Sequence, residues 1–153
     1  MQIAVHPGKG KTEAITGMNT ESKIPNEGEV FFDVRCYALT KGKERVKLIL
    51  NVEAQKSYYL TYPWILRALF YCARMVSEQK DTEFRHDEYG DLKKVYSIWL
   101  FMESPECAAH TISSYTITHN TLYGEYVEKE RYDLMNVIAV RLAVNENLEG
   151  GSE

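Results

Sequence analysis

The sequence has no long apolar segment: no apolar stretch approaches the roughly 18 residues that a membrane-spanning helix needs. It also has no charged and then apolar leader, so neither a membrane span nor a secretory signal is expected. Cysteine is scarce: Cys36, Cys72 and Cys107 are widely spaced and form no C-x-x-C pair. Such an odd, scattered set indicates neither a zinc site nor a disulfide framework and fits a reducing cytoplasm.

Positive charge is also in short supply. The chain carries 18 basic against 22 acidic residues, a formal net charge of -4, which argues against broad nonspecific attraction to a polyanion. A local groove for DNA remains compatible with this balance. The 153 residues, 44% of them hydrophobic, suffice for one domain with a real core. We expect that domain over residues 13–145, with a flexible basic arm at 1–12 and a flexible acidic tail at 146–153.

Two strand-like runs stand out near the centre of the chain. Residues 31–39 and 46–55 alternate with a period of two and are joined by the turn-like segment 40–45, so they predict a β-hairpin. The alternation places the polar residues on one face, namely Asp33, Arg35, Lys47, Asn51, Glu53 and Gln55. The other face holds Phe32, Val34, Cys36, Leu48, Leu50, Val52 and Ala54.

The polar face of this hairpin brings two carboxylates together. If the turn is centred near Lys43, Asp33 lies opposite Glu53, with Cβ atoms about 5 Å apart. Two carboxylates at that distance repel by roughly 3 kcal/mol at an effective dielectric constant of about 20. A cation between them would relieve the repulsion, and the Gln55 amide two residues on adds another oxygen, as a Mg²⁺ site requires. The alternative is a solvated face on which Arg35 and Lys47 pair with the carboxylates.

The remaining elements predict an α/β fold. A helix is expected from Tyr62 to Lys80, with Pro63 in its first turn. It carries a polar stripe of Arg67, Tyr71, Arg74 and Glu78. Its broad apolar stripe consists of Ile65, Leu66, Leu69, Phe70, Cys72, Ala73, Met75 and Val76. Residues 95–102 predict a central strand, 113–119 an outer strand and 132–143 a further strand. The expected architecture is a mixed sheet of five or six strands with the helix on one face.

The order of these motifs resembles a known nuclease family. Asp33, then Glu53-x-Gln55, then a helix with Arg67 and Tyr71 is similar to the PD-(D/E)XK nuclease superfamily. Within it the chain resembles the recombination-promoting nuclease and putative transposase branch, in which glutamine commonly stands where the superfamily has lysine. Further phrases similar to this branch are residues 17–21, 51–55, 71–75 and 94–99, so the resemblance covers roughly residues 14–145.

The resemblance implies a restriction-endonuclease-like core and a metal-dependent endonuclease that acts on DNA. Asp33 and Glu53 would then hold Mg²⁺ or Mn²⁺, and Gln55 would position the attacking water. Arg67 and Arg74, with Tyr71 between them, would contact phosphate. The superfamily usually supplies a further acidic residue from a helix before the first strand. Residues 1–11 show no helical apolar period, so this N-terminal helix is expected to be absent.

Two other classes of protein stay open at this point. The chain could be a catalytically degenerate nuclease-fold module that binds DNA or protein. It could instead be a structural interaction domain whose exposed tyrosine and arginine side chains meet another protein, and Arg67 and Arg74 could simply pair with Glu78 or sheet carboxylates. A homodimer is compatible with every one of these interpretations.

Overall fold

The computed structural model describes residues 15–24, 28–39 and 47–143. The expectations for an arm at 1–12, a turn at 40–45 and a tail at 146–153 lie outside these residues. The strands are β1 (Ile15–Gly17), β2 (Glu21–Ile24), β3 (Gly28–Phe31), β4 (Val34–Leu39), β5 (Lys47–Ser57), β6 (Lys94–Ser104), β7 (Thr111–Thr116) and β8 (Met135–Ala143). Helix α1 spans Trp64–Ser77, and a short 3₁₀ turn, η1, spans Tyr89–Asp91.

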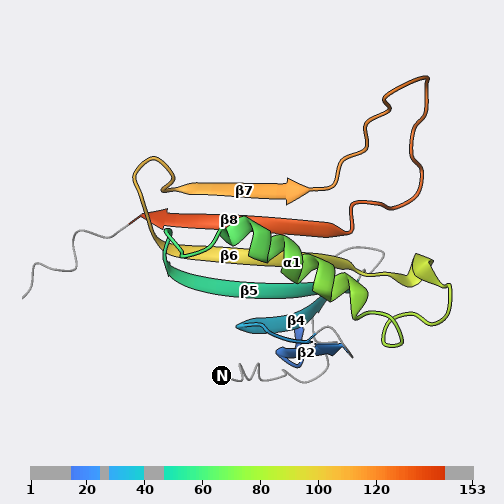
Figure 1. The fold of residues 1–153 in the computed structure, drawn as a ribbon, viewed down its shortest axis with the longest axis horizontal. Coiled ribbons are helices and arrows are strands. Elements are labelled where there is room, and N and C mark those ends of the chain that lie inside the picture. The colour runs from blue at the N-terminus through green and yellow to red at the C-terminus, as the bar shows by residue number, and fades with distance from the viewer. Residues whose placement is uncertain (1–14, 25–27, 40–46, 144–153) are drawn as a thin grey trace, which may run out of the picture.

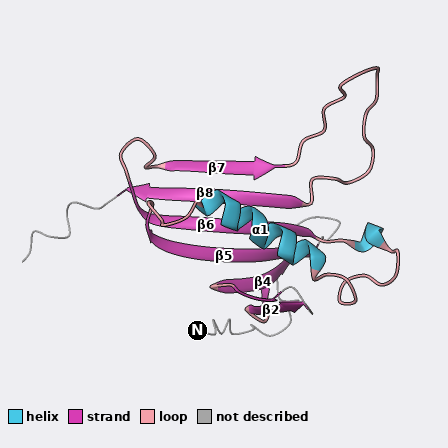
Figure 2. Ribbon diagram, viewed as in Figure 1, coloured by secondary structure: helices cyan, strands magenta, loops and turns pink. Residues whose placement is uncertain are grey.

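Six of the strands form one mixed sheet in the order β1-β4-β5-β6-β8-β7. β5, β6 and β8 are parallel to one another, whereas β4 and β7 run antiparallel to their neighbours. α1 makes the crossover between the parallel strands β5 and β6, a connection that a short turn could not supply. Figure 1 shows α1 lying diagonally across one face of this sheet, and Figure 2 shows it as the one long helix of the described chain. The predicted α/β fold, a mixed sheet with one flanking helix, is confirmed.

The first predicted strand is divided in two. Phe31 ends β3, which pairs with β2 in a separate two-stranded sheet, and β4 begins only at Val34. The two residues between them, Phe32 and Asp33, make a bend rather than continuing the strand. This bend lets the Phe32 ring turn beneath α1, where its centroid lies 5.0 Å from that of Tyr71.

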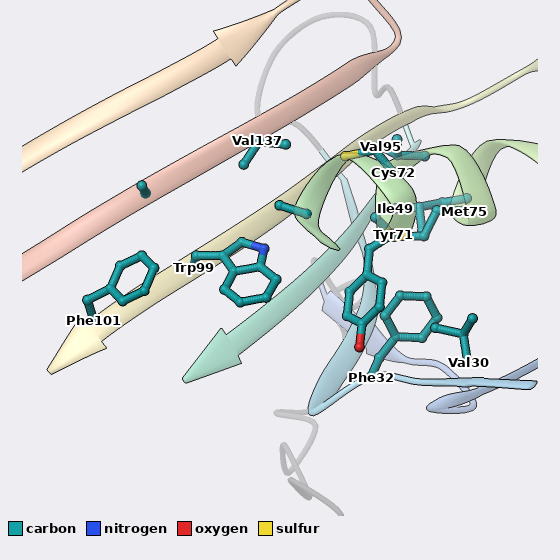
Figure 3. Packing of buried hydrophobic residues seen from close by; sticks show 12 residues of the cluster. Val30, Phe32, Ile49, Tyr71, Cys72, Met75, Val95, Trp99, Phe101 and Val137 are labelled. Atoms are coloured by element: carbon teal, nitrogen blue, oxygen red, sulfur yellow. The ribbon is translucent and has the colours of Figure 1, made fainter. Parts of the chain in front are cut away.

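The core lies between α1 and the sheet. Cys72 and Met75 of the helix and Val95, Trp99 and Phe101 of β6 have no exposed surface. Figure 3 shows Val95, Cys72 and Met75 grouped beside α1 and Trp99 and Phe101 following along β6, with the Phe32 and Tyr71 rings below the helix. From Lys94 to Phe101 of β6, buried residues alternate with half-buried ones, because α1 covers one face of the sheet. β6 is a central strand of the sheet, as predicted. The face of β6 that lies away from α1 is less buried than the face beneath the helix.

The two stripes of α1 match the sequence prediction only in part, since Cys72 and Met75 of the predicted apolar stripe are buried as expected. Tyr71 and Arg74, assigned to the polar stripe, face the sheet and are buried. Leu66, Leu69 and Phe70, assigned to the packing stripe, are largely exposed. The polar stripe finds partners on its inner side, because Tyr71 donates to the Phe31 carbonyl of β3 and Glu78 pairs with Arg35 of β4. Among the described residues, no helix has both the length and the hydropathy to cross a membrane.

Candidate active site

The structure places Asp33 and Glu53 side by side. β4 and β5 pair with Val34 opposite Val52, and this register continues one step to set Asp33 against Glu53. Two hydrogen bonds hold the pair. The Asp33 backbone N–H donates to Glu53 Oε1 at 3.1 Å, and the Ala54 backbone N–H donates to Asp33 Oδ2 at 3.2 Å. Each carboxylate is therefore fixed by the backbone of the opposite strand.

The two carboxylates differ in their exposure to solvent. Asp33 is exposed at the start of β4, whereas Glu53 is only 1% exposed beneath α1. Burial, together with the charge of Asp33, raises the pKa of Glu53 to about 6, although the Asp33 N–H, Arg67 and Asn51 favour the ionised form. A cation that binds beside Glu53 would stabilise the ionised carboxylate, because it offsets both the cost of burial and the repulsion from Asp33.

A buried polar chain supports Glu53 from below. The Asn51 side chain, fully buried two residues earlier on β5, hydrogen-bonds to Glu53. Asn51 Nδ2 also donates to Ser97 Oγ on β6 at 3.3 Å, and Trp99 Nε1 donates to the same hydroxyl at 2.9 Å. Asn51 Oδ1 is buried and has no hydrogen-bond partner among the described residues. Such an orphaned oxygen is a group that a water or a cation would satisfy.

Asn51 and Ser97 belong to this polar chain but are not among the predicted site residues. Asn51 shares the strand parity of Glu53, and this was the signal that could have identified it. Ser97 lies within the apolar run 95–102. Its hydroxyl in an otherwise apolar strand is the signal of a polar contact in the core.

Arg67 lies above the carboxylates in a cage of aromatic side chains. Its Nε donates to the Tyr71 hydroxyl at 2.8 Å, its Nη1 donates to the Tyr62 hydroxyl, and Tyr71 in turn donates to the Phe31 carbonyl at 3.2 Å. The guanidinium carbon is 5.0 Å from the Tyr71 ring centroid and 5.9 Å from that of Trp99. Arg67 is close enough to Glu53 for its charge to favour the ionised carboxylate, which opposes the rise that burial causes in the pKa of Glu53.

Gln55 and Arg74 occupy the two flanks of this group. Gln55 is half-buried on β5 with the same parity as Glu53, while Lys56 points to the other face and pairs with Glu103 at 3.8 Å. Arg74 is 4% exposed and lies two helical turns beyond Arg67, with its guanidinium carbon 5.8 Å from the Phe70 ring. Phosphate binding by Arg74 stays a prediction.

Arg35 is not the partner of the two carboxylates. It pairs instead with Glu78, the residue that caps the C-terminus of α1, and Ser22 of β2 donates a hydrogen bond to the same carboxylate. Burial lowers the pKa of Arg35 to about 10. The alternative in which Arg35 neutralises Asp33 and Glu53 is therefore not the arrangement in the structure, and Glu78 is engaged by Arg35.

The donor set fits a hard divalent cation that keeps part of its water shell. Two carboxylates and the nearby amide oxygens are all oxygen donors, and Mg²⁺ is commonly bound through one or two carboxylates with waters completing the shell. The described residues contain no cluster of three or more histidine, cysteine or carboxylate side chains that could enclose a metal by themselves. A soft or fully protein-coordinated metal is therefore a poorer fit to Asp33 and Glu53 than Mg²⁺ or Mn²⁺.

Comparison with known proteins gives one match. A family model described as PD-(D/E)XK nuclease family transposase matches residues 4–147. No curated protein and no solved structure matches the chain. The matched span contains the paired carboxylates, the buried Asn51 and the whole of α1.

Proposed function

Since the chain belongs to the PD-(D/E)XK nuclease family transposases, we propose that it is a metal-dependent endonuclease that hydrolyses DNA phosphodiester bonds. The observation that carries the proposal is the reciprocal clamp between Asp33 and Glu53, in which each carboxylate accepts a backbone N–H from the opposite strand. Two acidic side chains fixed in this way, one of them buried, are stabilised further when a cation binds beside them.

In the proposed site Asp33 and Glu53 hold Mg²⁺ or Mn²⁺. The ion, when bound, would neutralise charge on the scissile phosphate and make a coordinated water more acidic. Asn51 hydrogen-bonds to the buried Glu53 carboxylate and helps to hold it in place. The bent backbone at Asp33 keeps the second carboxylate at the exposed side of the pair, where a substrate can approach.

Gln55 and Arg67 take the remaining roles. The Gln55 amide would orient the attacking water by hydrogen bonding, but it cannot accept the proton, because an amide does not titrate near neutral pH. Arg67 would donate to a phosphate oxygen next to the scissile bond, and Tyr62 and Tyr71 keep its guanidinium plane in place before DNA arrives. Arg74 would contribute from the next turns of α1.

The second candidate function is a catalytically degenerate module that binds DNA or protein through the same fold. Two observations favour it: Gln55 stands where the superfamily has lysine, and the net charge of -4 weakens general attraction to DNA. Such a module would bind a divalent cation without cleaving DNA.

The test separates metal binding from cleavage. Calorimetric titration of Mn²⁺ into the wild type should show binding that Asp33→Ala removes and that Asp87→Ala, a change at an exposed loop carboxylate, leaves intact. Cleavage of supercoiled plasmid should follow the same order, and Gln55→Lys should preserve or increase it, because lysine is the usual residue at this position of the superfamily.

Three results would distinguish the candidates. Metal binding and cleavage that both depend on Asp33 support the nuclease. Metal binding with no cleavage by either the wild type or Gln55→Lys supports the degenerate module. Cleavage by Asp33→Ala at the wild-type rate would mean that the activity belongs to another site or to a contaminant.

A further inference from the structure

One edge of the sheet is left open in a way that invites another strand. β7 is the last strand of the order, and no described strand lies on its outer side. Its sequence, Thr111–Thr116, contains no charged residue, no proline and no glycine. Soluble proteins usually protect such an edge with charges, proline or a bulge, because its free N–H and C=O groups pair readily with another chain. The opposite edge, β1, has only three residues.

The segment that follows β7 extends past the same edge. Residues 117–134 connect β7 to β8, and Figure 1 shows this connection, here called the arm, rising beyond β7 on the side away from β8. Its base is fixed by Arg131, which donates to the carbonyls of Gly90 and Leu92 at 2.7 and 3.2 Å. Within the arm, the Thr121 hydroxyl donates to the Tyr126 carbonyl at 2.7 Å. The arm is thus a tethered projection with internal contacts.

The tip of the arm carries apolar side chains that the described residues leave largely exposed. Leu122 is 96% and Tyr123 99% exposed, and Tyr126 and Val127 are exposed as well. Gly124, with a φ of +74°, makes the sharp turn that presents them. Exposed apolar groups of this size, next to an open strand edge, are typical of a protein interface.

Charge decides which kind of partner fits. Between residues 117 and 130 the arm carries Glu125, Glu128 and Glu130 against the single basic residue Lys129. An acidic arm would be repelled by DNA, so nucleic acid is a poor occupant. β7 itself is uncharged, and an uncharged strand can meet a copy of itself across a two-fold axis without placing like charges opposite each other.

We propose that two copies of the chain associate through β7 in antiparallel fashion, so that one sheet continues across both, and that each arm packs against the partner. A two-fold axis perpendicular to the sheet keeps α1 of both copies on the same face. Odd-numbered residues of one copy then oppose odd-numbered residues of the other, and even-numbered residues oppose even-numbered ones. The axis passes midway between the two copies of Ser113 or between the two copies of Ser114. The four apolar side chains of each arm tip contribute on the order of 500 Å², a large share of the roughly 800 Å² that each partner buries in a stable interface.

Ser114 gives the sharpest test. Ser114 is exposed and lies on the same face of β7 as Ile112. Ser113 accepts a hydrogen bond from Arg141, so it is not mutated. In either register Ser114 lies opposite or diagonal to Ser114 of the other copy. Sedimentation velocity over a concentration series should show a dimer for the wild type and for Ser114→Thr. Ser114→Lys and Ser114→Glu should each dissociate at least tenfold more readily, because like charges then face each other across the axis.

Mixing the two charged variants provides the decisive control. An equimolar mixture of Ser114→Lys and Ser114→Glu should recover the dimer, since opposite charges meet at the same position, and this recovery also shows that both variants are folded. Leu122→Ser should weaken the dimer at least tenfold. Leu66→Ser, a matched change at an exposed leucine on the outer side of α1, should leave the dimer intact.

Each alternative outcome would overturn the proposal. A wild type that remains monomeric up to about 1 mM has no such interface. A dimer that persists in both charged variants, or one that Leu66→Ser removes while Leu122→Ser does not, would assign association to another surface. None of these outcomes depends on metal binding or cleavage, so they are separate from the test of the proposed function.

Discussion

Replacing Glu53 with glutamine should stabilise the metal-free protein at neutral and alkaline pH. The pKa of Glu53 is about 6 in the folded protein against an ordinary value of 4.5, with burial as the main cause. One pKa unit corresponds to 1.36 kcal/mol, so ionised Glu53 costs at most about 2 kcal/mol of folding free energy. Because the folded-state pKa is raised, the protonated acid favours folding. This contribution is fully present below about pH 4.5 and is lost as the pH rises through 6.

Glutamine tests this cost with little change in shape. It removes the charge but keeps an oxygen that can accept the Asp33 N–H, which now donates to Glu53 Oε1 at 3.1 Å. The expected gain is therefore about 1–2 kcal/mol at pH 8, shrinking to zero below about pH 4.5. For a chain of 153 residues this corresponds to an increase of roughly 2–8 °C in the melting temperature.

The assay is urea unfolding in the presence of EDTA at pH 8, 6 and 4.5, followed by circular dichroism. Glu106→Gln, a change at an exposed carboxylate, serves as the matched control and should have little effect at any pH. With Mn²⁺ present, the same measurement should show the wild type to be more stable than Glu53→Gln. The wild type then gains the free energy of ligand binding to the native state, and Glu53→Gln gains less because it has lost a ligand.

A clear loss of stability in Glu53→Gln at pH 8 without metal would refute the reasoning. It would mean that the Glu53 carboxylate is a structural partner of a cationic group such as Arg67. The ionised carboxylate would then be stable in the folded protein without a bound metal ion. An equal gain at pH 8 and pH 4.5 would also contradict the argument, because the effect would then be unrelated to ionisation.

Two further changes test the surroundings of the pair. Asn51→Ala should weaken Mn²⁺ binding about tenfold, since a hydrogen bond to a charged group contributes about 1.5–3 kcal/mol, and calorimetric titration that finds an unchanged affinity would show that Asn51 does not hold Glu53. Glu78→Gln should cost about 3–5 kcal/mol in urea unfolding, because it leaves the buried Arg35 without its counter-ion, whereas Glu88→Gln at an exposed loop position should cost little. A loss below about 1 kcal/mol for Glu78→Gln would indicate that water replaces the carboxylate.

The sequence by itself determined the family and most of the elements. The period-two alternation around Glu53, the apolar run 95–102 and the helical pattern after Pro63 correspond to β5, β6 and α1, because each is a local pattern that one element satisfies. The order of Asp33, Glu53 and Gln55 resembled the PD-(D/E)XK branch, and the family match over residues 4–147 confirms it. The outer position of the strand near Ser113 was also predicted correctly.

The tertiary structure decided which faces meet. Alternation fixes which residues of a strand or helix share a face, but it does not say which face lies inward when both carry apolar side chains. Here Tyr71 and Arg74 of the polar stripe of α1 are buried, as are Glu53 and Asn51 on the polar face of the hairpin, while Leu66 lies outward. Pairing with Glu78 likewise took Arg35 away from the carboxylates. These outcomes depend on contacts between residues far apart in the chain, because buried polar groups are stable only where distant partners satisfy them.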